Sequence, residues 1–229
     1  MKINSVTLTT SKLAALRSFY ADTLGLPLCL DEAQRFAVVI GQSTLCFEHS
    51  PEAASYHLAF NIPENQLEAG LLWLQQQGVS ALDFEQNIII DFPNWNAHAL
   101  YFVDPAGNVL ELIARHDLDN AQTKAFSADS LLNISEVGLP CPDVGQLYAW
   151  LSDFCRVPVY SHISNMTKFC AAGDPQGLFI IVPLERPWFP TSVLNGLYPL
   201  RVTIEGTEAV KAMPPGLPYQ FELLAPAQK

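Results

Sequence analysis

The stretch AHALYFVDPAGNVLELIAR, residues 97–115, is the part of the sequence that says most about the fold. Two apolar runs flank the tetrapeptide DPAG at 104–107, which is typical of a tight turn, so the stretch predicts a strand hairpin. One acid, Glu111, interrupts the second apolar run. Because an unpaired buried carboxylate is very costly, Glu111 must reach solvent or have a partner inside the protein.

The hairpin closes a unit that begins about 40 residues earlier. SYHLAFNIP (55–63) predicts a strand, ENQLEAGLLWLQQQG (64–78) a helix, and SALDFE (80–85) a further strand. A similar unit precedes it, with a strand at 2–10, a helix within 11–27 and three short strands around 28–32, 35–41 and 43–50. Each unit therefore predicts a βαβββ module.

The pattern returns in the second half of the chain, after a polar segment at 116–132 that reads as a linker. The apolar and turn residues between Ile3 and Pro27 recur between Ile134 and Pro158, and each pair is separated by the same number of residues. This constant spacing indicates an internal duplication. YPLRVTI (198–204) and QFELLAP (220–226) match YHLAFNI (56–62) and VLELIAR (109–115), but they lie closer together. The predicted organisation is a two-module domain at 1–115, a linker at 116–132 and a truncated domain at 133–229.

Composition narrows the classes of function. The chain has 229 residues, 49% hydrophobic and 15% charged, with a net charge of −11, so it can bury a core but has no basic excess for nucleic acid or an anionic membrane. No apolar window is long enough to span a membrane, and the first residues lack a secretion signal. Five cysteines without CxxC spacing favour reduced thiols and a cytoplasmic location.

Three segments resemble the vicinal oxygen chelate superfamily of glyoxalases, extradiol dioxygenases and bleomycin-resistance proteins: FYADTLGLPL (19–28), YFVDPAGNVLEL (101–112) and GDPQGLFIIVPLERPWFPT (173–191). The resemblance implies an α+β fold in which paired modules form curved, incompletely closed eight-stranded sheets. It also implies a divalent metal on the concave side, bound from the first and last strands of each module. Glu111 is then expected to face the cavity.

The resemblance implies metal ligands at four positions, and the sequence matches two of them. His57 opens the first strand of the second module and Glu111 lies on its last strand, whereas Ser5 and Cys46 stand where His and Glu are usual in the first module. Cys46 could supply a thiolate, and Glu48, on the same strand face, could reach in instead. Zn²⁺, Mn²⁺ and Fe²⁺ are candidate ions. Alternatively, His57 and Glu111 simply hydrogen-bond in a wet cavity without metal.

Three further residues are candidates for contact with a substrate. The resemblance implies that Tyr101 donates a hydrogen bond to substrate, although an aromatic residue here could serve packing alone. Trp95 and His98 are expected at the mouth of the cavity, where Trp95 could stack on a planar ligand and His98 could transfer protons. Either residue could instead cap a loop.

The second half is predicted to hold no metal site, because Pro199 replaces a ligand. Glu136 and Glu222 occupy the other matching positions and are expected to face and repel each other. Trp188 and Phe189 suggest a packed loop rather than a site. This half would close the first half or form a homodimer interface.

The leading hypothesis is a glyoxalase-like or dioxygenase-like enzyme that uses a divalent metal on a small-molecule substrate. The missing second histidine weighs against the dioxygenase form. The alternatives are a metal-free protein that sequesters a small molecule, as bleomycin-resistance proteins do, and a non-catalytic scaffold whose cavity is filled by its own side chains.

Overall fold

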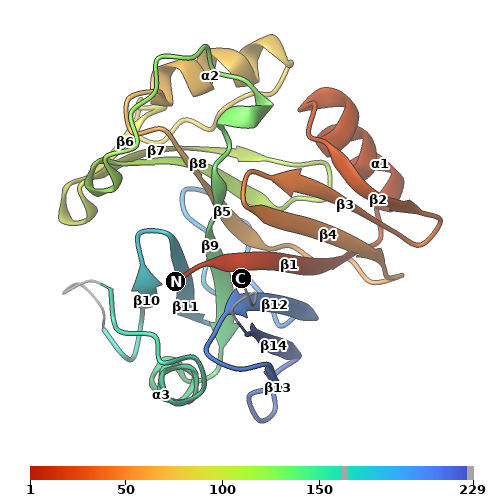
Figure 1. Cartoon of the computed structure of the whole chain (residues 1–229), viewed down its shortest axis with the longest axis vertical. Helices are drawn as coiled ribbons and strands as arrows, with labels where there is room; N and C mark the ends of the chain where they lie inside the picture. The colour runs from red at the N-terminus through yellow and green to blue at the C-terminus, as the bar shows by residue number, and fades with distance from the viewer. Residues whose placement is uncertain (161–164, 226–229) are drawn as a thin grey trace.

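The chain folds into two curled, open sheets of seven strands each, with few helices (Figure 1). The computed structural model describes residues 1–160 and 165–225. The first sheet contains, in spatial order, β13 (Val210–Ala212), β14 (Tyr219–Leu224), β12 (Leu200–Glu205), β1 (Ile3–Thr10), β4 (Ser43–His49), β3 (Arg35–Ile40) and β2 (Leu28–Glu32). The second contains β10 (Cys170–Asp174), β11 (Gly177–Pro183), β9 (Asn133–Cys141), β5 (His57–Ile62), β8 (Val109–Arg115), β7 (Ala97–Val103) and β6 (Ile90–Phe92).

The repeat predicted from the sequence is visible in the strand pairing. In four successive segments the first strand pairs in parallel with the last: β1 with β4, β5 with β8, β9 with β11, and β12 with β14. Two antiparallel contacts then join these segments into the two sheets, β1 with β12 and β5 with β9. This α+β architecture is the predicted fold class.

The choice of partners differs from the expectation. The second module was expected to share a sheet with the first, but it pairs with the third, and the first pairs with the last (Figure 1). Each sheet therefore takes strands from both sides of the 116–132 segment, and each has seven strands rather than eight. Repeated first strands offer similar free edges, so local sequence does not decide which two edges meet.

The helices pack on the outer faces of the sheets. They are α1 (Leu13–Arg17), which continues as a π-helical turn η1 (Ser18–Thr23), α2 (Leu67–Gln76) and α3 (Val144–Cys155), with short 3₁₀ turns at Pro93–Trp95, His116–Leu118 and Ala128–Ser130. A continuous apolar core joins these helices to both sheets. Every helix among the described residues is too short or too polar to cross a membrane.

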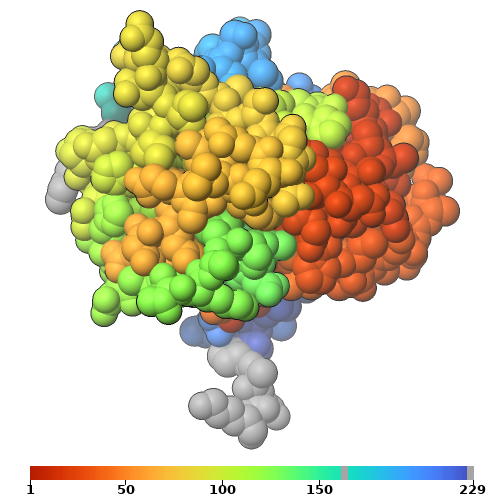
Figure 2. Space-filling model, turned by 90° about the horizontal axis from the view of Figure 1, so that it is seen from above, coloured from red at the N-terminus to blue at the C-terminus, as the bar shows by residue number. Residues whose placement is uncertain are grey.

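Two local expectations need correction. No strand forms at 80–85, and the edge strand of this module is β6 instead. Residues 80–85 contribute a backbone hydrogen bond from Leu82 to the carbonyl of Tyr101 and an isolated bridge from Phe84 to Asn87. The 116–132 segment is polar but docked: the Gln66 side chain donates to the carbonyl of Lys124 at 2.6 Å, and Trp73 contacts the Phe126 ring. Figure 2 shows this segment, in green, lying against the region of α2.

Candidate metal centre

Three ionisable side chains meet on the concave face of the second sheet. Glu111 on β8 and Glu136 on β9 both lie opposite Ala59, the β5 residue between them, and His57 lies two residues before Ala59 on the same face. Because alanine is small, the space above it is open to the two carboxylates. All three ionisable side chains are buried. Two successive modules thus contribute to one site.

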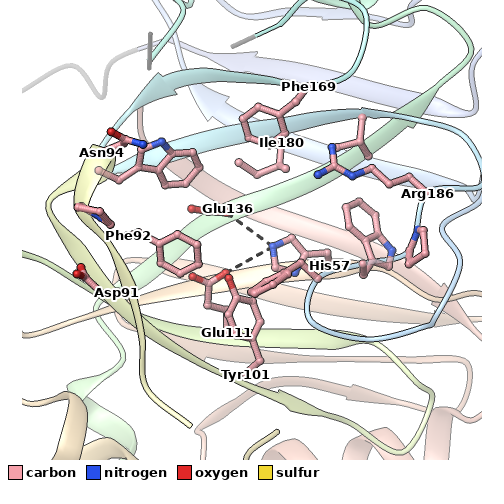
Figure 3. Close-up of a pocket in the computed structure, with 16 residues that line it drawn as sticks. His57, Asp91, Phe92, Asn94, Tyr101, Glu111, Glu136, Phe169, Ile180 and Arg186 are labelled. Carbon is pink, nitrogen blue, oxygen red and sulfur yellow. Dashed lines mark ion pairs between the residues drawn. The ribbon is translucent and has the colours of Figure 1, made fainter. Parts of the chain in front are cut away.

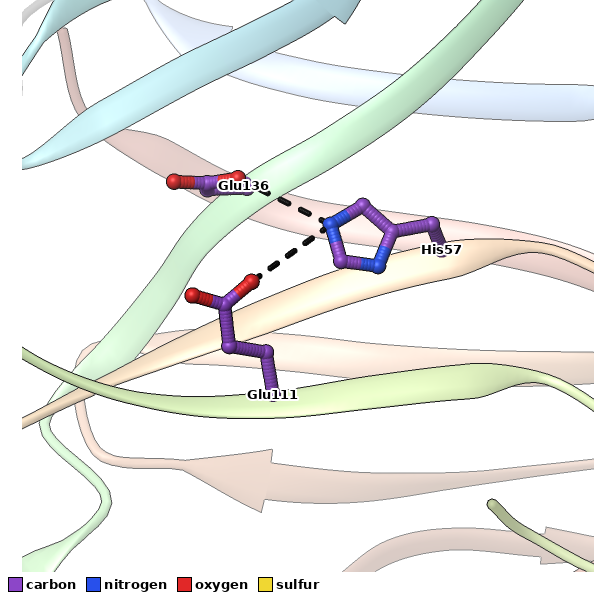
Figure 4. A group of neighbouring side chains, drawn as sticks. All are labelled: His57, Glu111 and Glu136. Atoms are coloured by element: carbon purple, nitrogen blue, oxygen red, sulfur yellow. Dashed lines mark ion pairs between the residues drawn. The ribbon is translucent and has the colours of Figure 1, made fainter. Parts of the chain in front are cut away.

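The three side chains point at one another (Figure 4). The Nε2 atom of His57 lies 3.7 Å from Oε2 of Glu111 and 3.7 Å from Oε2 of Glu136. The other ring nitrogen, Nδ1, lies 3.1 Å from the carbonyl oxygen of Val109. A carbonyl only accepts hydrogen bonds, so Nδ1 carries a proton, and Nε2 is the ring nitrogen that faces the two carboxylates.

The two carboxyl groups have opposite pKa shifts. Burial, followed by the nearby negative charge of Glu136, raises the pKa of Glu111 well above its ordinary value. Burial acts in the same direction on Glu136, but the neighbouring His57 and the Arg115 charge outweigh burial and lower its pKa. Without a metal, a proton bound by the pair is therefore held by Glu111 rather than by Glu136.

These residues fit a divalent cation. One imidazole and two carboxylates are suitable ligands for Mn²⁺, Fe²⁺ or Zn²⁺, and their ligand atoms all lie within 4.8 Å of one another. Ligands about 2.1 Å from such an ion stand roughly 3.0–3.5 Å apart at octahedral to tetrahedral angles. The observed separations of 3.7 Å are too long for direct hydrogen bonds but close to that spacing. In metal sites the ligating histidine commonly donates a hydrogen bond from its other ring nitrogen to a carbonyl, as Nδ1 of His57 does to Val109.

The centre forms the floor of a cavity of about 450 Å³ (Figure 3). Six aromatic side chains line it: Phe92, Trp95, Tyr101, Phe169, Trp188 and Phe189. Arg186 and Asp91, both exposed, lie at its edge. A cavity filled by the protein's own side chains would have favoured the scaffold hypothesis, and this cavity is not filled.

One wall depends on a glycine. Trp188 is buried and packs directly on Gly138 of β9. A Cβ added at Gly138 would lie 2.4 Å from the Cη2 atom of Trp188. Its ring centroid is 5.3 Å from that of His57. The loop after β11 therefore covers one side of the centre because β9 has no side chain at this point.

The structure brings some of the predicted site residues together. His57 and Glu111 share the cavity, and Tyr101 lines it and hydrogen-bonds to Glu111 from the neighbouring strand. Trp95 also lines the cavity. His98 is not part of the lining; its Nδ1 lies 2.9 Å from Nε2 of His116, outside the cavity.

The first-module candidates lie in the other sheet, away from His57. Ser5 and Cys46 belong to β1 and β4, and Cys46 lies opposite Thr7, as Glu111 lies opposite Ala59. On the other side of Thr7 is Arg201. This sheet therefore presents an arginine where the second sheet has Glu136.

That arginine also accounts for Glu48, which forms an ion pair with it. Burial and the Glu48 charge raise the pKa of the free Cys46 thiol, so a thiolate is disfavoured there. The expectation that Cys46 or Glu48 completes the His57 site is therefore wrong.

The expectations for the second half also change. Glu136 does not face Glu222: it lies with His57, while Glu222 pairs with Lys211 in the first sheet. Trp188, expected in a packed loop, is packed but also lines the cavity. The sequence does carry a signal for Glu136, because the repeat places it at a first-strand position like that of His57. The error lies in the sheet partner expected for its strand.

Comparisons with known proteins agree with this fold. No protein-family model and no curated protein matches the sequence. Among solved structures, a candidate dioxygenase from Bacillus subtilis matches 100% of this chain and 86% of its own, with 12% identity and a TM-score of 0.65. A lactoylglutathione lyase from Agrobacterium tumefaciens matches 48% of this chain and 90% of its own, with 20% identity and a TM-score of 0.42. A glyoxalase/bleomycin resistance protein/dioxygenase from Nocardioides matches 56% of this chain and 90% of its own, with 19% identity and a TM-score of 0.42. The chain therefore has the fold of the vicinal oxygen chelate superfamily, which the sequence resemblance predicted.

Proposed function

We propose that this chain is a divalent-metal enzyme of the glyoxalase or dioxygenase type, acting on a small molecule that presents two neighbouring oxygens to the ion. One observation carries the proposal. The Nε2 atom of His57 and the carboxylates of Glu111 and Glu136 converge in a buried cavity, 3.7 Å from nitrogen to each acid. Such a set of acceptors is stable together only around a proton or a cation.

The ligand set favours manganese or ferrous iron over zinc. His57 supplies one nitrogen and the two glutamates supply oxygens, and carboxylate-rich sets suit harder ions. With Cys46 in the other sheet, no thiolate draws the preference toward zinc. When bound, the ion would supply Lewis acidity to the two substrate oxygens.

The chain's own residues would prepare the substrate. The walls of the cavity are largely aromatic and apolar, which suits a planar or largely apolar molecule. Burial raises the pKa of Tyr101 well above its ordinary value, so its hydroxyl stays protonated. It donates to Glu111 beside the cavity and is therefore placed to hold a proton at a substrate oxygen.

The test is metal binding by the whole chain. After removal of metals with a chelator, Mn²⁺ should bind at one ion per chain by calorimetry and raise the thermal midpoint. His57→Ala and Glu111→Gln should each abolish this effect, and the double variant should lose nothing more because both ligands share one ion. Cys46→Ala is the matched control and should bind Mn²⁺ normally. No binding of Mn²⁺, Fe²⁺ or Zn²⁺ by the native chain would refute the proposal.

A metal-free binding protein is the second candidate, and the aromatic lining of the cavity favours it. With a net charge of −11 and Asp91 at the cavity edge, a cationic planar molecule would be the expected ligand. Binding of such a compound should weaken with salt and should not change when a chelator is added. An enzyme that requires the ion would lose its substrate binding or turnover in the chelator.

A further inference from the structure

Behind the candidate metal centre lies a completely buried arginine. Arg115, four residues after Glu111 on β8, has 0% of its surface exposed. Its Nη2 donates to Oε1 of Glu136 at 2.5 Å, and its Nε donates to Oγ of Ser135 at 3.2 Å. The guanidinium carbon lies 5.5 Å from the centroid of the Trp95 ring, which lines the cavity. Arg115 thus joins the metal-site acid to a cavity wall.

A β-bulge allows Arg115 to hydrogen-bond to both Ser135 and Glu136. The pairing of β5 with β9 shifts register between Glu136 and Ile134, so Ser135 is an extra residue. In a regular strand Ser135 and Glu136 would point to opposite faces, but at the bulge both reach the same guanidinium. Bulges often redirect a side chain next to a functional site.

A buried arginine is costly, and packing alone does not explain this one. Well-packed apolar side chains commonly replace buried ion pairs without loss of stability. Moreover, Nη1 of Arg115 is buried with no hydrogen-bond partner among the described residues. The guanidinium lies over the Trp95 and Tyr160 rings, but both of its side-chain hydrogen bonds go to Glu136 and the residue before it. The free-energy cost of burying Arg115 is therefore better explained by its effect on the Glu136 carboxylate.

Arg115 divides the two oxygens of Glu136 between two tasks. It holds Oε1, while Oε2 is the oxygen that faces Nε2 of His57. A carboxylate held in this way can offer an ion one oxygen but cannot rotate to offer both. A free carboxylate can bind through both oxygens, as Ca²⁺ prefers with its six to eight oxygen ligands.

We propose that Arg115 is a positioning residue that restricts Glu136 to one metal bond, which keeps coordination places open for substrate and selects against Ca²⁺. The inference rests on the proposed metal site. It concerns which ion the site prefers and how many places that ion keeps free.

The experiment compares the affinities of Ca²⁺ and Mn²⁺ in the full chain by calorimetry. Removing a residue that orients a metal ligand usually lowers metal affinity by about 10–100-fold. In Arg115→Met this loss should fall on Mn²⁺, while Glu136, free to bind through both oxygens, should retain or strengthen Ca²⁺ binding, so the ratio of the Mn²⁺ to the Ca²⁺ affinity should fall by at least about 10-fold. Water-proton relaxation by bound Mn²⁺ should also decrease, because Glu136 replaces one bound water. Arg201→Met is the matched control: this arginine pairs with Glu48 in the other sheet, and the ratio should stay at the native value.

Arg115→Lys covers the case in which Arg115→Met does not fold. Lysine keeps the positive charge but lacks the rigid, planar set of donors of the guanidinium, so it should hold Oε1 of Glu136 less firmly. The ratio of the Mn²⁺ to the Ca²⁺ affinity should therefore fall, but by less than in Arg115→Met. An unchanged ratio in the folded variants, or an equal loss of both ions, would overturn the positioning role while leaving the metal site intact. Absence of Mn²⁺ binding in the native chain would overturn both proposals.

Discussion

The same substitution, glutamate to glutamine, should cost far more stability at one acid of the candidate centre than at the other. In Glu136→Gln, Arg115 loses its counter-charge although it is fully buried. Removing one partner of a buried ion pair costs about 3–5 kcal/mol. For a chain of this length that corresponds to a fall in the thermal midpoint of roughly 6–20 °C.

Glu111→Gln should cost far less in the metal-free protein. Burial and the Glu136 charge already raise the pKa of Glu111, so glutamine replaces a side chain that is neutral there. The amide has nearly the same shape, and its oxygen can still accept from Tyr101. The free energy of unfolding should therefore change by less than about 1 kcal/mol, as for substitutions that disturb no charged partner.

Urea unfolding of the metal-free variants at neutral pH, followed by tryptophan fluorescence and circular dichroism, measures this difference. Both variants should lose the stabilisation by Mn²⁺, which for the native chain is about 2.7 kcal/mol when the ion is present at 100 times its dissociation constant. Equal losses of stability in the two variants, or a larger loss in Glu111→Gln, would refute the assignment of the charge to Glu136 and the proton to Glu111.

Three further predictions concern the same cavity. Burial raises the pKa of Glu111, so Glu111 in the folded metal-free chain retains a proton that the unfolded chain loses, and stability should fall as pH rises above about 4.5. Saturating Mn²⁺ should reduce this slope in urea titrations and leave the part due to Asp104, whose pKa burial also raises. Gly138→Ala places a Cβ 2.4 Å from Trp188 and should cost about 1–3 kcal/mol, with a change in tryptophan fluorescence; an unchanged spectrum would contradict the packing. Tyr101→Phe should lower turnover by about 10²–10⁴-fold if the hydroxyl transfers a proton, while Mn²⁺ affinity measured by calorimetry changes little; equal losses of both would assign Tyr101 to the metal site instead.

Patterns that are local in the chain predicted much of this protein correctly. The resemblance of its segments to the vicinal oxygen chelate superfamily implied that His57 and Glu111 share the concave face, and the DPAG turn specifies the hairpin that carries Glu111. The constant spacing that relates Ile3 to Ile134 and Pro27 to Pro158 is enough to reveal the repeated modules. These features depend on residues a few positions apart, or on the likeness of one segment to another, so the sequence alone determines them.

Only the tertiary structure decided which modules meet. The β5 edge could have paired with β1, which would have placed Ser5 and Cys46 beside His57; it pairs with β9 instead, which brings Glu136. Similar repeats offer similar edges, so the outcome depends on packing summed over the whole chain. The same holds for Arg115, whose partner is separated from it by the 116–132 segment and is reached only because β5 lies between their two strands.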